Sequence, residues 1–295
     1  MNIAELRKND SSLADKVKLY TKPEDLAKLR VTNMLGAVVQ EDAAKLWPYK
    51  LVAHVLEELL DHGACSFNLQ TNTPASRLQR MKNSWLVHTP RGTFVAKDVL
   101  LTTNAYTSHL LPDFQNLIVP NRGQVAAVEV PKDSIPLPHT YVWFIDDGDS
   151  DVYLIQRDVS NTIILGGLRL SVHGGEKCIS RDNVINNKIA DELHEASSKA
   201  LKLRPQGEPE QKVLPSSMDW TGIMGFSADS HPWVGKVPEE LGGGEGLYIA
   251  AGYTGHGMPT AARSAIAAAQ QILKTTGVEL PPEYVLSMDR AKQYL

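Results

Sequence analysis

The stretch GLYIAAGYTGHGMPTAARSAIAAAQQILK, residues 246–274, decides the fold. Its apolar run LYIAA predicts a buried strand, and the alanine-rich run from Thr260 onward predicts a helix. Pro259 has no amide hydrogen and a fixed φ, so it suits the first turn of that helix. The stretch therefore predicts a strand, a glycine-rich turn and a helix in direct succession.

The glycine-rich turn contains Gly252, Gly255 and Gly257. A turn of this kind places several backbone N–H groups at the open end of the helix, where the helix dipole adds about half a positive charge. Such an end suits a phosphate, a carboxylate or an electron-rich carbonyl of a ring cofactor, and glycines let a flat ligand approach the backbone. The spacing is equally typical of glycines that only let the helix pack tightly on the strand.

The residues before this stretch predict a mixed architecture. Residues 121–170 carry four strand-like runs, which predict an antiparallel meander with turns at residues 146–150 and 158–161. A long amphipathic helix is predicted from about residue 182 to residue 203, with Pro205 ending it.

The N-terminal part combines helices with further strands. Pro23 and Pro48 each predict the first turn of a helix, and Gly63 predicts the end of the second one. From residue 67 to residue 106 the apolar period changes to two, so FNLQT, SWLVHT and TFVAKDVLLTTNA are predicted strands. A tight turn is predicted at residues 90–92.

Composition narrows the class of protein. Of the 295 residues, 42% are hydrophobic and 22% charged, and the formal net charge is -4, which is typical of a globular protein and argues against a nucleic-acid partner. No apolar run approaches the roughly 20 residues of a membrane span, and the N-terminus lacks the apolar region of a secretory signal. Cys65 and Cys178 match no metal or redox spacing, so we expect no metal site and a reducing, cytoplasmic location.

Five motifs occur in the order found in one family of oxidoreductases. They are LLTTNAYTSHLLP, VPNRGQVAAVE, YLIQR with IILGGLR, DSHPWVGKVP and AAGYTGHGMP. Together they resemble the D-amino-acid-oxidase-like FAD-dependent oxidoreductases, and LWPYKLV and GYTGHGMP resemble the fungal members most. The resemblance covers nearly the whole chain. It implies an amine or amino-acid oxidase with non-covalent FAD, whose affinity could be weak or lost.

The resemblance also implies a set of site residues. In this family the strand, turn and helix near the C-terminus lie against the flavin ring, where their N–H groups stabilise the charge of the reduced ring. Further positions match segments that contact the cofactor, and two more lie in the segment at the substrate face. The implied cofactor-binding residues are Gly252, Tyr253, Thr254, Gly255, His256, Gly257, Met258, Ala75, Thr103 and Asn104, and the candidate catalytic residues are Trp220, Met224 and His256.

Several side chains have a plainer interpretation beside the functional one. His256 could be a partly exposed turn residue whose neighbours' backbone binds the ligand. Trp143 and Phe144 could line a substrate pocket or pack in the core. Arg122 could be a structural hydrogen-bond donor or a clamp for a carboxylate.

The family normally opens with a strand, a GxGxxG turn and a helix that hold the ADP half of FAD. We find no such unit in this sequence. Its absence is expected to leave the strands VLLTT and LYIAA without a neighbour. Three explanations stay open: a truncated oxidase, a protein completed by a partner chain, or a shortened relative reused for a non-redox task.

We therefore expect an α+β fold, in which an incomplete FAD-binding Rossmann-like domain is interleaved with an antiparallel-sheet substrate domain. Residues 37–120 and 218–295 would form the FAD side, and residues 1–36 and 121–217 the substrate side. The expected reaction is hydride transfer from a C–H next to nitrogen of a small-molecule substrate to flavin. The alternative is a non-redox catalyst or binding protein that uses the old flavin pocket.

Overall fold

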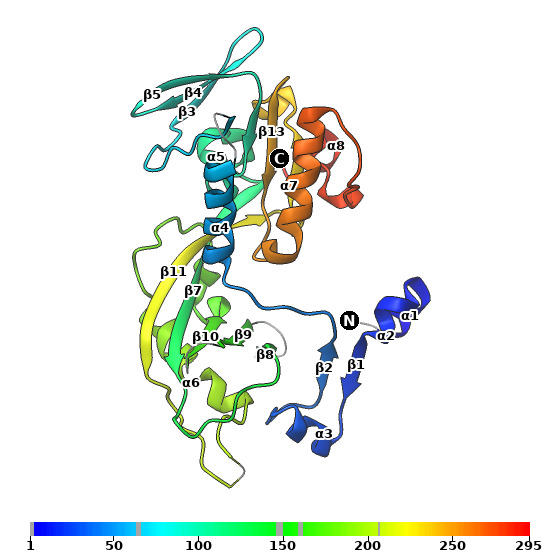
Figure 1. Cartoon of the computed structure of the whole chain (residues 1–295), viewed down its shortest axis with the longest axis vertical. Coiled ribbons are helices and arrows are strands. Elements are labelled where there is room, and N and C mark those ends of the chain that lie inside the picture. Colours follow the sequence, from blue (N-terminus) through cyan, green and yellow to red (C-terminus); the bar gives the residue numbers. More distant parts are fainter. Residues whose placement is uncertain (1–2, 63–65, 146–149, 159–161, 206) are drawn as a thin grey trace. The chain divides into compact units, whose positions relative to one another are not determined.

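The computed structural model describes residues 3–62, 66–145, 150–158, 162–205 and 207–295 (Figure 1). Gly63 and the centres of the two turns predicted at 146–150 and 158–161 lie outside the described residues. Contacts divide the chain into two compact units. The first holds residues 1–68, 124–175 and 184–221, and the second holds residues 69–123, 176–183 and 222–295.

The second unit is built around residues 246–274, which hold the predicted strand, glycine turn and helix. Strand β13 (Leu247–Ala251) is buried along its whole length, and helix α7 (Gly257–Leu273) follows it after the glycine turn. Both predictions are confirmed, although the helix begins three residues before Thr260. In the sheet, β13 lies between β12 (Trp233–Lys236), which is antiparallel to it, and β6 (Val99–Leu101), which is parallel. Within the described residues β6 and β12 each have β13 as their single neighbour in this sheet, and β12 also forms an isolated bridge between Val234 and Val285. The expected loss of a neighbour therefore applies to VLLTT and is wrong for LYIAA, which lies between two strands.

A second sheet of this unit joins β3 (Arg77–Arg80), β4 (Trp85–Thr89) and β5 (Gly92–Ala96) in antiparallel order. The tight turn predicted between the last two strands is confirmed, because Thr89 pairs with Gly92. The strand predicted at FNLQT is wrong. Asn72 has a left-handed φ of 51° and Pro74 lacks an amide donor, so pairing begins only after them.

The core of the second unit contains Trp85, Phe114, Ile118, Trp233 and Ile249. Short helices close around it and connect its strands. They are η2 (Asn104–Tyr106), α5 (Thr107–Leu110), η3 (Pro112–Phe114), η7 (Glu239–Leu241), η8 (Pro282–Tyr284) and α8 (Met288–Ala291).

The first unit contains the predicted antiparallel sheet. Its order is β11-β7-β10-β9-β8, and the predicted meander is confirmed for the three consecutive strands that pair side by side. β7 and β11 contribute residues to both units, with the division after Gly123 and Thr221. The bounds are β7 (Ile118–Glu129), β8 (Tyr141–Ile145), β9 (Ser150–Gln156), β10 (Thr162–Gly167) and β11 (Ser216–Ser227).

Helix α6 (Asn187–Ala200) packs on β9 and β10, and it is shorter than predicted. Asn186 caps its start by accepting a hydrogen bond from the Lys188 amide at 3.2 Å. At the other end Leu201 leaves the helix and pairs with Val31 in an isolated bridge, so the helix ends before Pro205. The apolar period runs past the C-terminal end because Leu201 and Leu203 belong to the core of this unit, whereas Val184, before the helix, is exposed.

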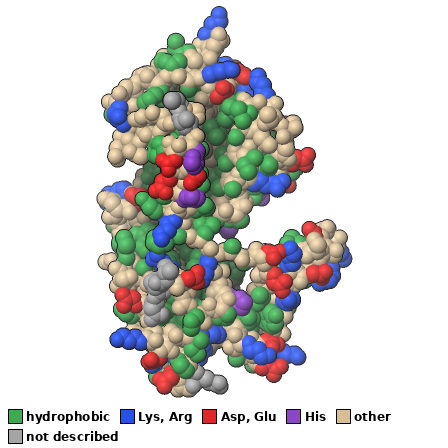
Figure 2. Space-filling model, viewed as in Figure 1, with side chains coloured by type: hydrophobic (Ala, Val, Ile, Leu, Met, Phe, Trp, Pro, Cys, Tyr) green, Lys and Arg blue, Asp and Glu red, His purple; other side chains and the backbone are tan. Residues whose placement is uncertain are grey.

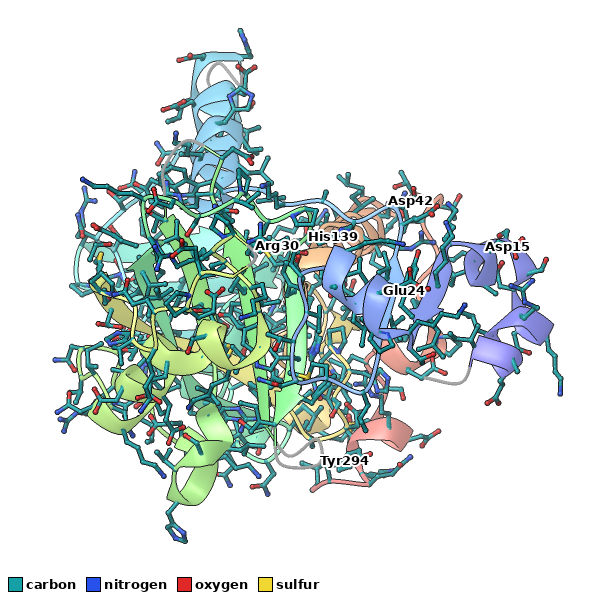
Figure 3. All side chains as sticks on the ribbon, turned by 90° about the horizontal axis from the view of Figure 1, so that it is seen from below. Asp15, Glu24, Arg30, Asp42, His139 and Tyr294 are labelled. Atoms are coloured by element: carbon teal, nitrogen blue, oxygen red, sulfur yellow. The ribbon has the colours of Figure 1, made fainter. Side chains whose placement is uncertain are left out.

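The N-terminal part of the first unit carries the two proline-led helices, which are confirmed. Arg30, labelled in Figure 3, donates hydrogen bonds to the carbonyls of Ile135 and Pro136. None of the described helices is long and apolar enough to cross a membrane. The elements of the N-terminal part are α1 (Ile3–Asn9), α2 (Ser11–Asp15), β1 (Val17–Tyr20), α3 (Pro23–Lys28), β2 (Ala37–Gln40) and α4 (Pro48–His62). Strand β1 is antiparallel to β2. Two short helices, η5 (Arg169–Ser171) and η6 (His173–Glu176), lie later in the chain.

Candidate functional site

The glycine turn is a left-handed corner between β13 and α7. Gly252 has a φ of 81° and Gly255 a φ of 77°, values that glycine adopts at little cost. Thr254 also has a positive φ, 53°, which is unfavourable for a β-branched residue. Its conformation is fixed by β11: the Thr254 amide donates to the Gly225 carbonyl at 2.8 Å, and the Ser227 amide donates to Thr254 Oγ1 at 3.0 Å.

Asn104 holds the turn from the other side. It follows β6 with a φ of 44°, a left-handed conformation that asparagine tolerates better than most residues. Its Oδ1 accepts a hydrogen bond from the Gly252 amide at 2.9 Å and a longer one from the Tyr253 amide at 3.4 Å. The Oδ1 atom of Asn104 is therefore already hydrogen-bonded within the chain.

These contacts reduce the number of amides that can face a ligand. Those of Gly252, Tyr253 and Thr254 are bound as just described, and the His256 amide donates to the Tyr253 carbonyl at 2.8 Å. Gly255 is exposed, and Gly257 and Met258 open α7, where the first amides have no acceptor inside the helix. Pro259 has no amide hydrogen. Of the seven residues predicted in the turn, Gly255, Gly257 and Met258 are therefore the three whose amides are candidates for binding a ligand.

His256 is exposed on this turn, and its ring orientation is fixed. Its Nδ1 lies 2.7 Å from the Thr254 carbonyl oxygen. Because a carbonyl can only accept, Nδ1 carries the proton and Nε2 is the acceptor of the neutral ring. The side chain can therefore offer a lone pair when neutral and a second N–H when protonated.

Met224 packs beside the turn from its place on β11. Its Sδ lies 3.7 Å from the position that a Cβ on Gly255 would take, and the Phe226 ring lies 3.8 Å from the same point. These two side chains support the turn from the strand that also supplies the Gly225 carbonyl. Phe226, Gly225 and Ser227 were not predicted from the sequence; the only available signal was their position one to three residues after Met224 in the same strand.

The remaining predicted residues occupy other surroundings. The Thr103 hydroxyl lies 3.0 Å from that of Thr107, an interaction within its own chain segment. Ala75 is half-buried just before β3, and Trp220 is half-buried on the part of β11 that belongs to the first unit. Trp143 is only 7% exposed and belongs to the first unit's core, so packing is its role. Its neighbour Phe144 is exposed.

Arg122 proves to be a structural donor. It is buried, its Nε donates to the equally buried carboxylate of Glu176, and its Nη1 donates to the Arg181 carbonyl at 3.2 Å. A guanidinium engaged in this way is not presented to a substrate carboxylate. Glu176 and Arg181 lie too far from Arg122 in the sequence for the pairing to be predicted from spacing.

The chemistry of the turn comes from backbone and neutral side chains. Burial raises the pKa of the Tyr253 phenol, against a smaller opposing effect of its hydrogen bond with Ser264, so the phenol stays neutral near pH 7. Among the described residues no group of three His, Cys, Asp or Glu side chains could hold a metal ion. A hollow of about 460 Å³ adjoins the first turn of α7 and is lined by Pro259, Thr260, Arg263, Glu279, Leu280, Pro281 and Tyr284.

A buried strand, a glycine turn and the N-terminus of a long helix follow one another here, an arrangement that is typical of sites for electron-rich ligands. The chain belongs to the family described as FAD dependent oxidoreductase, DAO, whose model matches residues 2–271. A sequence search of curated proteins finds no match.

Solved structures of oxidases share this fold. Glycine oxidase from Geobacillus kaustophilus has a TM-score of 0.71 at 19% identity, with 92% of this chain and 67% of that chain covered. L-proline dehydrogenase from P. horikoshii has a TM-score of 0.70 at 20% identity, covering 93% and 70%. An Amadoriase I mutant from Aspergillus fumigatus has a TM-score of 0.72 at 13% identity, covering 99% and 68%. The chain thus spans about two thirds of each of these structures.

The residues of the turn fit the ring end of FAD. The head of this 17-residue helix has no side-chain cap, and its first amides and positive dipole end would suit the carbonyl-bearing edge of a flavin, which becomes more negative on reduction. Gly255 is exposed, whereas the Tyr253 side chain lies 3.3 Å from the position that a Cβ on Gly257 would take. No residues of comparable geometry can be assigned, within the described ranges, to the pyrophosphate and adenosine.

Proposed function

We propose that the protein is an FAD-dependent oxidoreductase of the amine or amino-acid oxidase type, with hydride transferred from a C–H next to nitrogen to a non-covalently held FAD. The observation that carries the proposal is the head of α7, which has no side-chain cap and where the amides of Gly255, Gly257 and Met258 would face the ligand, in a chain of this family. The family supplies the class of reaction, and the turn supplies the physical reason for it.

When bound, FAD would supply the electron-accepting ring. The three amides would hold its electron-rich edge and stabilise the negative charge of the reduced form, aided by the positive end of the α7 dipole. Because the turn is fixed by Asn104 and Gly225, these donors need no reorganisation as charge develops. Pro259 leaves the helix head one donor short of a full first turn.

We propose the substrate face for Met224 and Trp220, and a polar contact to the ligand for the Nε2 of His256. Met224 is supported by its packing beside Gly255, and His256 by its exposure and fixed tautomer. A neutral amine can give up hydride without a general base, so none of these side chains needs to remove a proton from carbon. Contacts of Ala75 and Thr103 with the cofactor stay predictions. Covalent attachment through residues 218–229 is unsupported because they contain no cysteine.

We propose that the second unit is the flavin side and the first unit the substrate side. The turn, Asn104 and β6 support this, because all belong to the second unit. Residues 37–68, predicted on the flavin side, cluster instead with the first unit. A fungal origin and a cytoplasmic location stay predictions that rest on the sequence.

We also propose that a further polypeptide segment, on a partner chain or in a longer form of the protein, pairs with β6. This strand is an edge strand of the sheet, and the N–H and C=O groups along its outer edge have no strand partner among the described residues. Parallel strands rarely stop at a pair, and open edges recruit further strands.

A second candidate is a non-redox protein that binds a small molecule at the same helix head. It is favoured by one observation: Asn104 occupies two of the amides predicted to contact the flavin. In that case the three outward amides would serve a carboxylate or phosphate instead.

The two candidate functions predict different visible absorption spectra for the protein. We expect purified protein to show the visible absorption of oxidised flavin, either as isolated or after addition of FAD, with FAD released on denaturation. Riboflavin, which has the ring without the ADP half, is the matched control ligand: similar affinities for both would show that the ring end provides the binding. A folded protein that stays colourless in excess FAD and riboflavin would contradict the oxidase and favour the second candidate.

A further inference from the structure

We propose that Asn104 is a positioning residue, whose side-chain oxygen fixes the glycine turn so that the amides of Gly255, Gly257 and Met258 face the ligand. The inference rests on the proposed function for its consequence in flavin binding, although the mechanical part stands on geometry alone. Asn104 itself would then not touch the cofactor through Oδ1, because that atom is already engaged by the chain.

The first step is the double hydrogen bond. Oδ1 accepts from the amides of both Gly252 and Tyr253, at 2.9 and 3.4 Å. These are the first two residues after β13, where the chain leaves the sheet and the strand ladder no longer satisfies its donors. One side-chain oxygen therefore replaces the missing acceptors at the point where the turn begins.

The second step is the fit of Asn104 between the segments that meet here. A Cβ built on Gly225 would lie 2.6 Å from Asn104 Oδ1 and 2.9 Å from the Ala105 amide nitrogen. Glycine at position 225 is thus required by the Asn104 side chain, while the Gly225 carbonyl accepts from Thr254. Asn104 and Gly225 are neighbours, and together they accept hydrogen bonds from three consecutive amides of the turn, those of residues 252–254.

The third step is the backbone of Asn104. Its φ of 44° costs free energy for any residue with a Cβ, though less for asparagine than for most. The conformation places the side chain toward the turn and not along β6. Asparagine is suited to this position because it tolerates the left-handed region and also carries an acceptor.

The test uses Asn104→Gly in the full chain. Glycine adopts the same backbone conformation freely, so the variant removes the acceptor without straining the fold. Asn72→Gly is the matched control, because Asn72 is also left-handed, with a φ of 51°, and lies in an exposed loop of the same unit. Asn104→Asp is the conservative variant, since its carboxylate keeps an acceptor oxygen at the same reach.

The first readout is hydrogen exchange of the amides in residues 247–262, which needs no ligand. We expect Asn104→Gly to speed exchange at Gly252 and Tyr253 by about tenfold, the equivalent of one lost hydrogen bond to a buried group. Asn104→Asp should restore protection, and Asn72→Gly should leave it unchanged. Unchanged exchange in Asn104→Gly overturns the proposal.

The second readout is the affinity for FAD, followed by the flavin spectrum. If the wild-type protein binds FAD, we expect about tenfold weaker binding by Asn104→Gly and none of this loss in Asn72→Gly. Faster exchange with unaltered FAD affinity would overturn the role in presenting donors. A wild-type protein that binds no FAD, with faster exchange in Asn104→Gly, would refute the proposed function and still support Asn104 as the residue that fixes the turn.

Discussion

The guanidinium of Arg290 is held from several sides within the second unit. Its Nε and Nη2 donate to the two carboxylate oxygens of Asp229 at 2.7 and 2.9 Å, and it lies 3.6 Å from the centre of the Trp233 ring. It also donates to the carbonyls of Pro232 and His231 at 3.0 Å. A bidentate, largely buried ion pair of this kind fixes the C-terminal segment to the loop before β12.

We expect Asp229→Asn to lower the free energy of unfolding by about 3 kcal/mol at neutral pH, because it leaves the Arg290 charge buried without its partner. Urea denaturation followed by tryptophan fluorescence measures the change, and Trp233 reports on the site directly. Asp289→Asn is the control, since Asp289 is exposed on α8 next to Arg290. A loss no larger than that of the control would show that the pair contributes nothing measurable.

The same pair sets a pH dependence. Burial alone raises the pKa of the Asp229 carboxyl, but the hydrogen bonds from Arg290, Ser227 and His231 outweigh it and hold the pKa below its ordinary 3.8. A lowered folded-state pKa stabilises the protein above the unfolded value, and this stabilisation is lost as the pH falls through the folded value. The difference between wild type and Asp229→Asn should therefore narrow below about pH 4.

Residue types in the turn could be predicted from the sequence, whereas their partners could not. The glycines and the helix start follow from local spacing, which a single stretch displays. The hydrogen bond between Asn104 and the Gly252 amide joins residues 148 positions apart in the sequence, and the ion pair of Arg122 with Glu176 joins residues 54 positions apart. No local pattern encodes such distances, so the roles of these polar side chains became clear only from the fold.

Helix α4 has an apolar face that the described structure leaves uncovered. None of its residues is buried, although Leu51, Val52, Val55 and Leu59 follow helical spacing and are 41–57% exposed. Acidic and histidine side chains gather over this helix in Figure 2. An amphipathic pattern predicts burial of one face, and an exposed apolar face of this size is characteristic of an interaction surface.

We expect Val52→Glu to change the free energy of unfolding of this chain by less than about 0.5 kcal/mol, because the side chain is already in water. The same substitution should clearly reduce binding of a hydrophobic fluorescent dye. Glu57→Gln, on the polar side of α4, is the control and should leave dye binding unchanged. A loss of about 2 kcal/mol or more would instead show that Val52 is buried in solution, as in a self-associated form.

The predicted helices and strands are confirmed where the hydrophobic periodicity is strong and residues typical of the ends of helices or strands flank it. The two proline-led helices, the meander and the strand–turn–helix near the C-terminus fall into this group. The failures have tertiary causes. Around α6 the apolar period continues into Val184 and Leu201, which lie outside the helix, and at FNLQT the apolar alternation precedes a left-handed residue and a proline.

At the scale of the whole molecule, the chain passes between its two units inside uninterrupted strands. β7 and β11 each run for 12 residues and change unit partway along. Gly123 and Gly222 stand at the two boundaries, but Gly225 also lies within β11 and Gly166 within β10, so a glycine in a strand does not by itself mark a change of unit. The family resemblance predicts that the two units are interleaved along the sequence. The residues at which the chain changes unit could be identified only from the structure.

The division into units gives the last prediction. Gly255, Gly257, Met258 and the turn that holds them all belong to the second unit, so FAD should stabilise that unit selectively. At a concentration about 100 times its Kd, a ligand that binds only the folded state adds about 2.7 kcal/mol. We expect FAD to slow hydrogen exchange in residues 252–262, with no comparable effect on α6 in the first unit. Riboflavin should reproduce the pattern if the ring end is the bound part. Protection centred on α6 would place the ligand elsewhere and contradict the assignment of the flavin side, because preorganised amides can stabilise charge only where they lie.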